Sequence, residues 1–291
     1  MRDGVGYLPE LADPARYLAK AETLILPLGS NGHRIPGIPE YSGPLREGVD
    51  LGTANTVLVV LDEQGNVIAG EYAFAQVVRD GLVVDYIGAV DLLREIKAHV
   101  ERRIGRELTH AASGFPPGVP RAEVRATTNV VEAAGMHCPS LIDEPTAANN
   151  MLGLQNGAIV DVGGGTTGIA VLKDGKVIYT ADEATGGTHF SLVIAGAMGI
   201  SFEDAEELKK NPQQQQRLFP IVRPVMEKVG TIVERHLRGL DVDSITLVGG
   251  TTAFPGMAEV VQEVTGIATR APERPLFVTP LGIAISDTQG L

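Results

Sequence analysis

The chain has 291 residues, of which 44% are hydrophobic and 21% are charged, a composition typical of a packed globular protein with room for two ordinary domains. Its formal net charge of -12 argues against a nucleic-acid surface, because binding to phosphate backbones draws on clustered Lys and Arg side chains. The single cysteine, Cys138, excludes an intramolecular disulfide, and no run of about 18 apolar residues is present, so we expect a cytoplasmic protein without a membrane span.

The first 43 residues differ in composition from the rest of the chain. Asp13 and Pro14 precede residues 15–26, which predict one short helix, and residues 29–44 are rich in Gly, Pro and Ser. We interpret residues 1–43 as an N-terminal appendage.

Two later segments share one pattern. Residues 48–56 (GVDLGTANT) and 160–167 (VDVGGGTT) each contain an aspartate at the end of an apolar stretch, followed by a run of small residues. A β-branched stretch follows each of them, 57–61 in the first copy and 169–172 in the second, and leads to a polar turn. Each copy therefore predicts a β-hairpin, and the repetition predicts two related lobes, at residues 44–156 and 157–279.

The other elements are predicted from hydrophobic periodicity and from Pro and Gly positions. In the first lobe they are a strand over 71–78, a turn at Asp80 and Gly81, an amphipathic helix over 90–104, and helices after Pro120 and Pro145. In the second lobe they are a strand over 177–181, a helix over 190–198, a helical subdomain over 201–240, a strand over 245–248 and a helix from about Pro255. Within the subdomain we predict a loop at 213–216 and a helix over 221–237 with Pro224 in its first turn, and we predict a C-terminal helix in residues 280–291.

Simpler explanations exist for each glycine turn taken alone. Gly163, Gly165 and Gly168 have the spacing of a dinucleotide-binding fingerprint, but that fingerprint requires a helix directly after the glycines, and a strand is predicted there instead. A plain tight turn explains one copy, and a strand-end cap explains Asp50 or Asp161 alone. The duplication argues against both explanations, because the two aspartates occupy equivalent positions.

The chemistry of the duplicated segments is that of a polyphosphate site. Small residues allow backbone N–H groups to approach an anion closely, and an aspartate can hold a hydrated divalent cation against phosphates. We therefore predict that the chain binds a nucleoside triphosphate with a divalent cation between the two lobes. The turn Gly249-Gly250-Thr251 after a buried strand would let a ribose or a flat ring lie against bare backbone, although a strand-to-helix turn without a ligand is the better explanation when this segment is taken alone.

These three glycine segments, in this order, resemble the superfamily of actin, heat-shock chaperones and sugar kinases over residues 48–62, 158–172 and 245–257. Within that superfamily the chain resembles the ethanolamine utilization EutJ family, which is described as chaperone-like. The segments that carry this resemblance are Val77 to Tyr86, Ser113 to Gly118, Asp143 to Ala147 and Ala181 to Gly187. The resemblance implies an α/β, two-lobed actin-like ATPase fold, of the duplicated ribonuclease H-like type, with reduced upper subdomains.

The resemblance also implies roles for individual residues. Asp50, Asp161 and Glu144 would be the catalytic residues. The two aspartates would hold hydrated Mg2+, and Glu144 would orient the attacking water. Glu206 and Lys209 would contact the ribose and adenine, and Gly249 and Gly250 would face the adenosine. The phosphates would be bound by Gly52, Thr53, Ala54 and Asn55 from the first lobe and by Gly163, Gly164, Gly165 and Thr166 from the second.

Two departures from DnaK-like chaperones bear on activity. The first-lobe lysine that steers hydrolysis in those chaperones has no counterpart here, and Ala253 stands where they stack an arginine on the adenine. We therefore expect slow hydrolysis, if ATP is hydrolysed at all, and modest affinity.

The resemblance implies a DnaK-like, ATP-binding chaperone of ethanolamine utilization. Its client would be a pathway enzyme or a shell component of a bacterial microcompartment. A small-molecule kinase of the same superfamily and an actin-like nucleotide-dependent scaffold are the alternatives.

Overall fold

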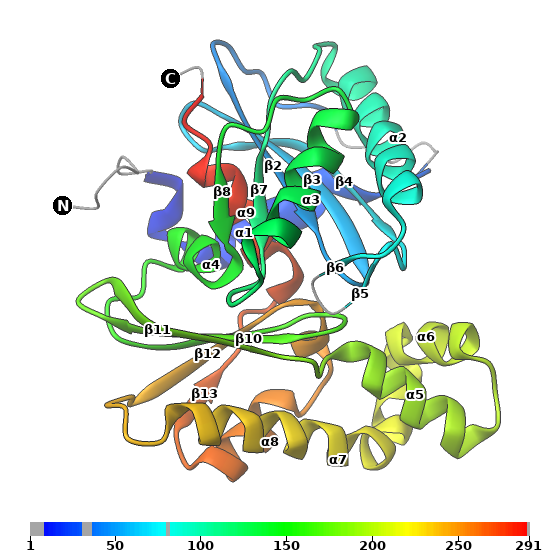
Figure 1. Cartoon of the computed structure of the whole chain (residues 1–291), viewed down its shortest axis with the longest axis vertical. Helices are drawn as coiled ribbons and strands as arrows, with labels where there is room; N and C mark the ends of the chain where they lie inside the picture. Colours follow the sequence, from blue (N-terminus) through cyan, green and yellow to red (C-terminus); the bar gives the residue numbers. More distant parts are fainter. Residues whose placement is uncertain (1–8, 31–36, 80–81, 290–291) are drawn as a thin grey trace. The chain divides into compact units, whose positions relative to one another are not determined.

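The structure is a computed structural model that describes residues 9–30, 37–79 and 82–289. It divides into two compact units, one formed by residues 1–153 together with 277–291 and the other by residues 154–276 (Figure 1). The predicted C-terminal segment 280–291 is therefore part of the same unit as the N-terminal half of the chain.

The described residues of the first unit form a six-stranded sheet in the order β1-β4-β3-β2-β7-β8. Strands β2, β3 and β4 are antiparallel neighbours, so the first predicted hairpin is confirmed, and β7 and β8 continue the sheet in parallel with β2. The strands are β1 (Ile25–Pro27), β2 (Leu45–Leu51), β3 (Asn55–Asp62), β4 (Val67–Phe74), β7 (Ala112–Phe115) and β8 (Leu141–Asp143). The short strands β5 (Val78–Arg79) and β6 (Leu82–Val83) pair with each other, and the predicted turn at Asp80 and Gly81 lies outside the described residues.

Helices cover this sheet and end where the sequence provides caps. The helices are η1 (Pro9–Ala12), α1 (Pro14–Leu24), α2 (Tyr86–Ile104), α3 (Arg121–Ala133), α4 (Glu144–Leu152) and α9 (Val278–Ser286). Helix α2 begins at Asp85, whose carboxylate accepts a hydrogen bond from the backbone of Gly88, and it ends at the left-handed Gly105. Its predicted apolar face is confirmed, since Val90, Leu93, Ile96, Val100 and Ile104 are all buried.

The described part of residues 1–43 is packed into the first unit and does not stand apart as we predicted. Strand β1 pairs in parallel with β4 at the edge of the sheet. Tyr17 and Leu18 of α1 are buried, and the Tyr17 hydroxyl donates a 2.7 Å hydrogen bond to the carbonyl of Gly65. The segment thus adds a strand and a covering helix to the first sheet.

The C-terminal helix α9 lies in close contact with α4. A Cβ atom added at Gly282 would lie 1.8 Å from the carbonyl oxygen of Ala147, so only glycine allows the two backbones to approach this closely. Leu281, Ile283 and Ile285 are fully buried. Residues distant in sequence therefore complete the core around β2 and α4.

The sheet of the second unit repeats the plan of the first. Its order over the described residues is β11-β10-β9-β12-β13, which matches β4-β3-β2-β7-β8: three antiparallel neighbours, then two strands that continue in parallel. The strands are β9 (Gly157–Val162), β10 (Thr167–Lys173), β11 (Lys176–Glu183), β12 (Ser244–Val248) and β13 (Ala268–Arg270). The second predicted hairpin is confirmed, and the dinucleotide-binding alternative is excluded, because a strand and not a helix follows the glycines.

Three helices of the second unit follow the predictions: α5 (Gly187–Met198), α6 (Phe202–Lys210) and α8 (Met257–Thr265). The 3-10 turns η2 (Gly250–Ala253) and η3 (Pro275–Phe277) were not predicted, and η3 ends at the first residue of the segment that returns to the other unit. In Figure 1, α7 (Pro212–Leu237) and α8 run along one face of the sheet. Among the described residues, no helix has both the length and the apolar character required to cross a bilayer.

The prediction for the start of α7 was wrong. Residues 213–216 were predicted as a loop and Pro224 as a first-turn residue, but both lie inside one continuous helix that also contains Pro220. The Asn211 side chain caps the helix by accepting a hydrogen bond from the backbone of Gln213, and Pro212 occupies the favourable first position. Glutamine is a good helix former, so a polar run after a strong cap extends the helix. The buried face that we predicted further along this helix is confirmed.

Candidate functional site

The two predicted phosphate loops are closed by equivalent hydrogen bonds. In loop 1, which joins β2 to β3, the N–H of Gly52 donates to the carbonyl of Asn55 at 3.0 Å. In loop 2, which joins β9 to β10, the N–H of Gly163 donates to the carbonyl of Thr166, also at 3.0 Å. The duplication seen in the sequence therefore extends to the conformation of the turn.

Loop 2 is held in place by the N-terminus of α5. The N–H of Gly187 donates to the carbonyl of Gly163 at 2.9 Å, and the N–H of Thr188 donates to the carbonyl of Gly164 at 2.7 Å. Two N–H groups of the first helical turn, which would otherwise lack intrahelical partners, are satisfied by the loop carbonyls. The positive end of the helix dipole favours this contact.

The third glycine segment contacts the second. The Thr251 hydroxyl donates to the carbonyl of Gly163 at 2.7 Å. Gly249 has φ +89 and ψ 153, a backbone region that is essentially restricted to glycine, and an added Cβ would lie 2.2 Å from Oδ1 of Asp161. The structure thus brings Asp161, loop 2 and the predicted adenosine segment, with Gly250 in the adjoining 3-10 turn, together within the second unit.

Asp161 lies near the end of β9, and only 7% of its surface is exposed. Thr166 of loop 2 is 9% exposed. A buried carboxylate beside a loop of closely spaced backbone N–H groups fits a polyphosphate with a hydrated cation. Among the described residues, no three His, Cys, Asp or Glu side chains are grouped as direct metal ligands.

The predicted residues of the first unit lie at one end of its sheet. Val49 of β2 pairs in parallel with Ser113 of β7, and Asp50 and Gly114 are the residues that directly follow this pair in each strand. Glu144, the first residue of α4, lies beside Gly114, with its Cγ 3.6 Å from the position of an added Cβ. Asp50, loop 1 and Glu144 therefore lie toward the same end of this sheet.

Loop 1 is also tied to the strand that follows the hairpin. The carbonyl of Ala54 accepts a 3.1 Å hydrogen bond from the N–H of Ala75. This hydrogen bond fixes loop 1 to the residue that directly follows β4.

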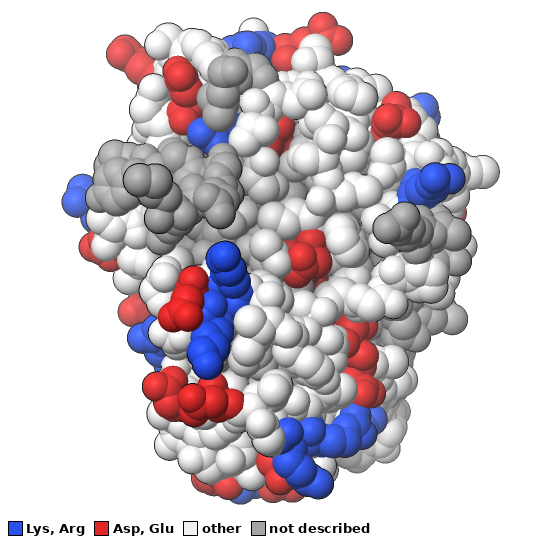
Figure 2. Space-filling view, turned by 60° about the vertical axis from the view of Figure 1, so that its left-hand side comes forward, with Lys and Arg blue, Asp and Glu red and all other residues white. Residues whose placement is uncertain are grey.

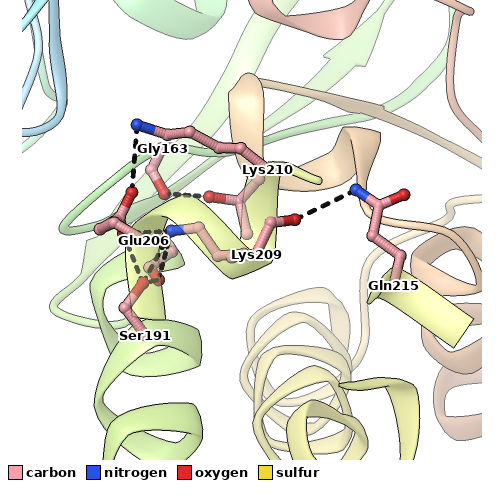
Figure 3. Close-up of polar contacts among 8 residues, drawn as sticks. Gly163, Ser191, Glu206, Lys209, Lys210 and Gln215 are labelled. Carbon is pink, nitrogen blue, oxygen red and sulfur yellow. Dashed lines mark hydrogen bonds and ion pairs between the residues drawn. The ribbon is translucent and has the colours of Figure 1, made fainter. Parts of the chain in front are cut away.

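Glu206 and Lys209, both on α6, form a buried cluster with Ser191 of α5 (Figure 3). The Lys209 ammonium donates to the carbonyl of Gly187 at 3.1 Å, to the Ser191 hydroxyl at 2.9 Å and to Glu206. The Ser191 hydroxyl also hydrogen bonds to Glu206, and Lys210 is 3.4 Å from the second oxygen of Glu206. Sequence reasoning missed Ser191, and its position four residues after Gly187 on the buried face of α5 is the signal that was available.

The ionisation of this cluster follows from its burial and pairing. Burial lowers the pKa of Lys209, and the neighbouring Glu206 carboxylate counteracts part of that effect. Burial alone would raise the pKa of Glu206, but the charge of Lys209 and the hydrogen bonds from Lys209 and Ser191 outweigh it, so the pKa of Glu206 is lowered. The cluster is therefore an ion pair, with the carboxylate ionised at neutral pH.

Charged side chains of both signs are mixed on the surface. Figure 2 shows one face of the molecule, on which Lys and Arg side chains occur in small separate groups, mostly beside Asp or Glu. On this face the basic groups do not merge into the extended basic surface that phosphate backbones require.

Two relatives are similar to this chain over most of its length. The ethanolamine utilization protein EutJ of Escherichia coli (strain K12) is 45% identical over 247 residues, which cover 84% of this chain and 87% of that protein. A chaperone protein HscA homolog of Chromobacterium violaceum is 27% identical over 67% of this chain, but the match covers only 40% of that longer protein. The family model for the type IV pilus assembly protein PilM matches residues 145–274.

Solved structures confirm the predicted fold class. The crystal structure of EutJ from Carboxydothermus hydrogenoformans superposes with a TM-score of 0.87 at 43% identity, and the match covers 95% of this chain and 99% of that one. The structure of MreB5 of Spiroplasma citri bound to AMPPNP superposes with a TM-score of 0.67 at 19% identity, over 84% of this chain and 95% of that one, and this likeness shows the fold alone. The fold is that of the actin-like ATPases. Because two EutJ proteins are 45% and 43% identical to this chain over most of its length, the chain belongs to the EutJ family of ethanolamine utilization proteins.

Proposed function

We propose that this protein binds ATP with Mg2+ through loops 1 and 2 and uses the bound nucleotide to assist the assembly or maintenance of ethanolamine-degrading enzymes or of their microcompartment. The observation that carries the nucleotide site is the repeated loop, with the same closing hydrogen bond from Gly52 to Asn55 and from Gly163 to Thr166. Two loops of one conformation, each following an aspartate on the preceding strand, suit a ligand that carries several phosphates.

Each residue set has a defined role in this proposal. Backbone and hydroxyl donors of residues 52–55 and 163–166 bind the phosphates. Asp50 and Asp161 hold the hydrated Mg2+, which shields the negative charge of the phosphates from this acidic chain. Gly249 and Gly250 face the adenosine, and Glu144 orients a water molecule if ATP is hydrolysed.

Relatives support both parts of the proposal. The actin-like MreB5 structure contains AMPPNP, an ATP analogue, which supports a nucleotide in this fold. The similarity to an HscA homolog supports a chaperone-like use of that nucleotide, and membership of the EutJ family supports ethanolamine utilization as the setting. We propose a cytoplasmic location and a protein client from the same pathway.

Calorimetric titration with ATP, with and without Mg2+, tests the nucleotide site. We expect binding that depends on Mg2+ in the wild type and at least tenfold weaker binding in Asp161→Asn, because the variant loses the charge that holds the cation. Asp241→Asn, a change of the same kind at an exposed position, is the matched control. If the wild type does not bind ATP at roughly millimolar concentration, the proposal is contradicted, because even weakly bound enzyme substrates bind in that range.

A further inference from the structure

Lys209 directs its ammonium group into the protein. The three acceptors that surround it, the Gly187 carbonyl, the Ser191 hydroxyl and the Glu206 carboxylate, all belong to the second unit. An ammonium group has three hydrogens to donate, so these partners account for its full capacity. Figure 3 shows Lys209 pointing toward Ser191 and Glu206, with Lys210 approaching Glu206 separately.

Two of these contacts lead directly to loop 2. The carbonyl of Gly187 accepts from Lys209, while the N–H of the same residue donates to the carbonyl of Gly163 in loop 2. The Ser191 hydroxyl lies one helical turn after Gly187, with its oxygen 3.3 Å from the Gly187 carbonyl. Lys209 thus holds the first turn of α5, and that turn holds the loop.

The C-terminal end of α6, which carries Lys209, is also held by a hydrogen bond. The side-chain amide of Gln215, in the first turns of α7, donates to the backbone carbonyl of Lys209 at 3.2 Å. Helices α5, α6 and α7 therefore all contribute to the position of this one lysine.

We propose that Lys209, together with Ser191 and Glu206, positions the second phosphate loop and does not contact the nucleoside of the ligand. The inference rests on the proposed nucleotide site, and it assigns Lys209 a role different from the ribose and adenine contact that the family resemblance implies. Ligand affinity then depends on the polyphosphate and Mg2+, and the base contributes little. The exposed Ala253, where DnaK-like chaperones carry a stacking arginine, agrees with weak recognition of the base.

Hydrogen exchange of the unliganded protein is the first test, because it needs no nucleotide. In Lys209→Met we expect the amides of Gly187 and Thr188, which bond to loop 2, to exchange roughly tenfold faster than in the wild type. Lys228→Met, the same change at an exposed position of α7, is the matched control. Unchanged exchange at these two amides would overturn the positioning role.

Lys209→Met leaves the buried Glu206 carboxylate without its main partner, which destabilises the fold. The double variant Glu206→Gln with Lys209→Met avoids this problem because the buried site is then neutral. Ser191→Ala removes one hydroxyl and leaves the ion pair in place. Both variants should raise exchange at Gly187 and Thr188, with the smaller increase in Ser191→Ala.

Calorimetry with separated parts of the ligand is the second test. Titration of Mg2+-tripolyphosphate, adenosine and Mg2+-ATP into the double variant should show roughly tenfold losses for both polyphosphate ligands and no change for adenosine. Wild-type protein should bind GTP within a few-fold of ATP, since Lys209 donates its three hydrogens within the protein and is then not available to hydrogen bond to the base.

The outcomes separate the two proposals. A loss confined to adenosine and ATP, with tripolyphosphate unaffected, would show that Lys209 contacts the nucleoside and would overturn the inference. If the wild type binds none of the ligands while exchange still rises in the variants, the nucleotide site is wrong but Lys209 positions the loop as described.

Discussion

Position 249 illustrates how a single residue type is imposed by its neighbours. Its backbone conformation, φ +89 and ψ 153, is one that side chains with a Cβ do not tolerate, and the space that a Cβ would need is occupied by the Asp161 carboxylate and the Val162 carbonyl. Glycine here therefore protects the position of the aspartate proposed to hold Mg2+.

The variant Gly249→Ala should lose Mg2+-ATP binding and be destabilised by roughly 2–4 kcal/mol, because backbone strain and the clash with Asp161 add. Gly266→Ala is the matched control, since Gly266 also has a positive φ, +68, but nothing lies within 4 Å of an added Cβ. We expect the control to be destabilised by only about 1 kcal/mol and to bind ligand normally. Urea unfolding and calorimetry measure the two effects, and equal losses in both variants would refute the role of the clash.

Glu47 of β2 is a buried acidic residue that is not part of the proposed nucleotide site. Its side chain is 2% exposed, its backbone N–H donates to the Asp287 carboxylate at 2.9 Å, and His110 lies 3.0 Å from that same carboxylate. Burial raises the pKa of Glu47 to about 8, although the nearby His110 opposes this effect. The pKa of His110 is also raised, mainly by its hydrogen bond to Asp287.

The stability of the protein should therefore fall as pH rises from about 5 to about 8. The folded state keeps a proton on Glu47 that the unfolded chain releases near the ordinary value of 4.5, so the stabilisation present below that value is lost as pH rises through the folded pKa of about 8. The raised pKa of His110 acts in the same direction. Across this range Glu47→Gln should gain stability relative to the wild type, on the order of 2–4 kcal/mol.

Urea unfolding at three pH values between about 5 and 8 measures this difference. The exposed Glu107→Gln should follow the wild-type dependence and serves as the control. A constant difference between Glu47→Gln and the wild type would show that Glu47 is not protonated in the folded protein.

Sequence reasoning predicted candidate site residues from patterns within one segment and missed contacts between distant segments. Asp161 and the loop glycines were predicted because their pattern is local and occurs twice. The contact between Glu47 and Asp287 joins residues 240 positions apart, so no spacing rule could indicate it. Ser191 was missed for a similar reason, since its partners lie on another helix.

At the scale of elements, the two hairpins were predicted more reliably than the helix boundaries. Both hairpins were predicted correctly because β-branched stretches and polar turns specify them within a few residues. The start of α7 was predicted wrongly because the polar run 213–216 suggested a loop and Pro224 suggested a first helical turn, whereas one helix continues through Pro220 and Pro224. Packing of its apolar face on the sheet outweighs the local cost of the prolines.

This cost leads to a prediction about α7. Pro220 and Pro224 are exposed, so replacement by alanine restores a backbone hydrogen bond without disturbing the core. Each of Pro220→Ala and Pro224→Ala should stabilise the protein by about 1–2 kcal/mol, after the greater freedom of the unfolded chain is deducted. Pro212→Ala, at the favourable first position of the same helix, should be neutral or slightly destabilising. Equal effects at all three positions in thermal unfolding would contradict this explanation.

At the scale of the whole molecule, the observed division differs from the predicted lobes because the chain returns to its first unit. The predicted boundaries, 44–156 and 157–279, follow the repeated pattern, whereas the compact units are 154–276 and a discontinuous set, 1–153 with 277–291. Composition marked the N-terminal segment as separate, but pairing of β1 with β4 joins it to the first sheet. Long-range packing of this kind leaves little trace in local sequence.

The discontinuous unit predicts different behaviour for the two halves when they are expressed alone. A fragment of residues 154–276 contains a complete sheet and its own buried cluster, so it should unfold cooperatively. A fragment of residues 1–153 lacks α9, whose Leu281, Ile283 and Ile285 are fully buried, and it leaves Arg46 without the carbonyls of Ile285 and Asp287.

We therefore expect the 1–153 fragment to lack a cooperative thermal transition and to recover one when residues 277–291 are joined to it through a flexible linker. Far-UV and near-UV circular dichroism distinguish fixed packing from a collapsed state with helices but no ordered core. Joining the same residues with Gly282→Val is the control, since a side chain at that position would collide with the Ala147 carbonyl and prevent docking of α9. Cooperative unfolding of residues 1–153 alone would mean that α9 covers a core already formed, and that the return of the chain serves some purpose other than completing the fold of the first unit.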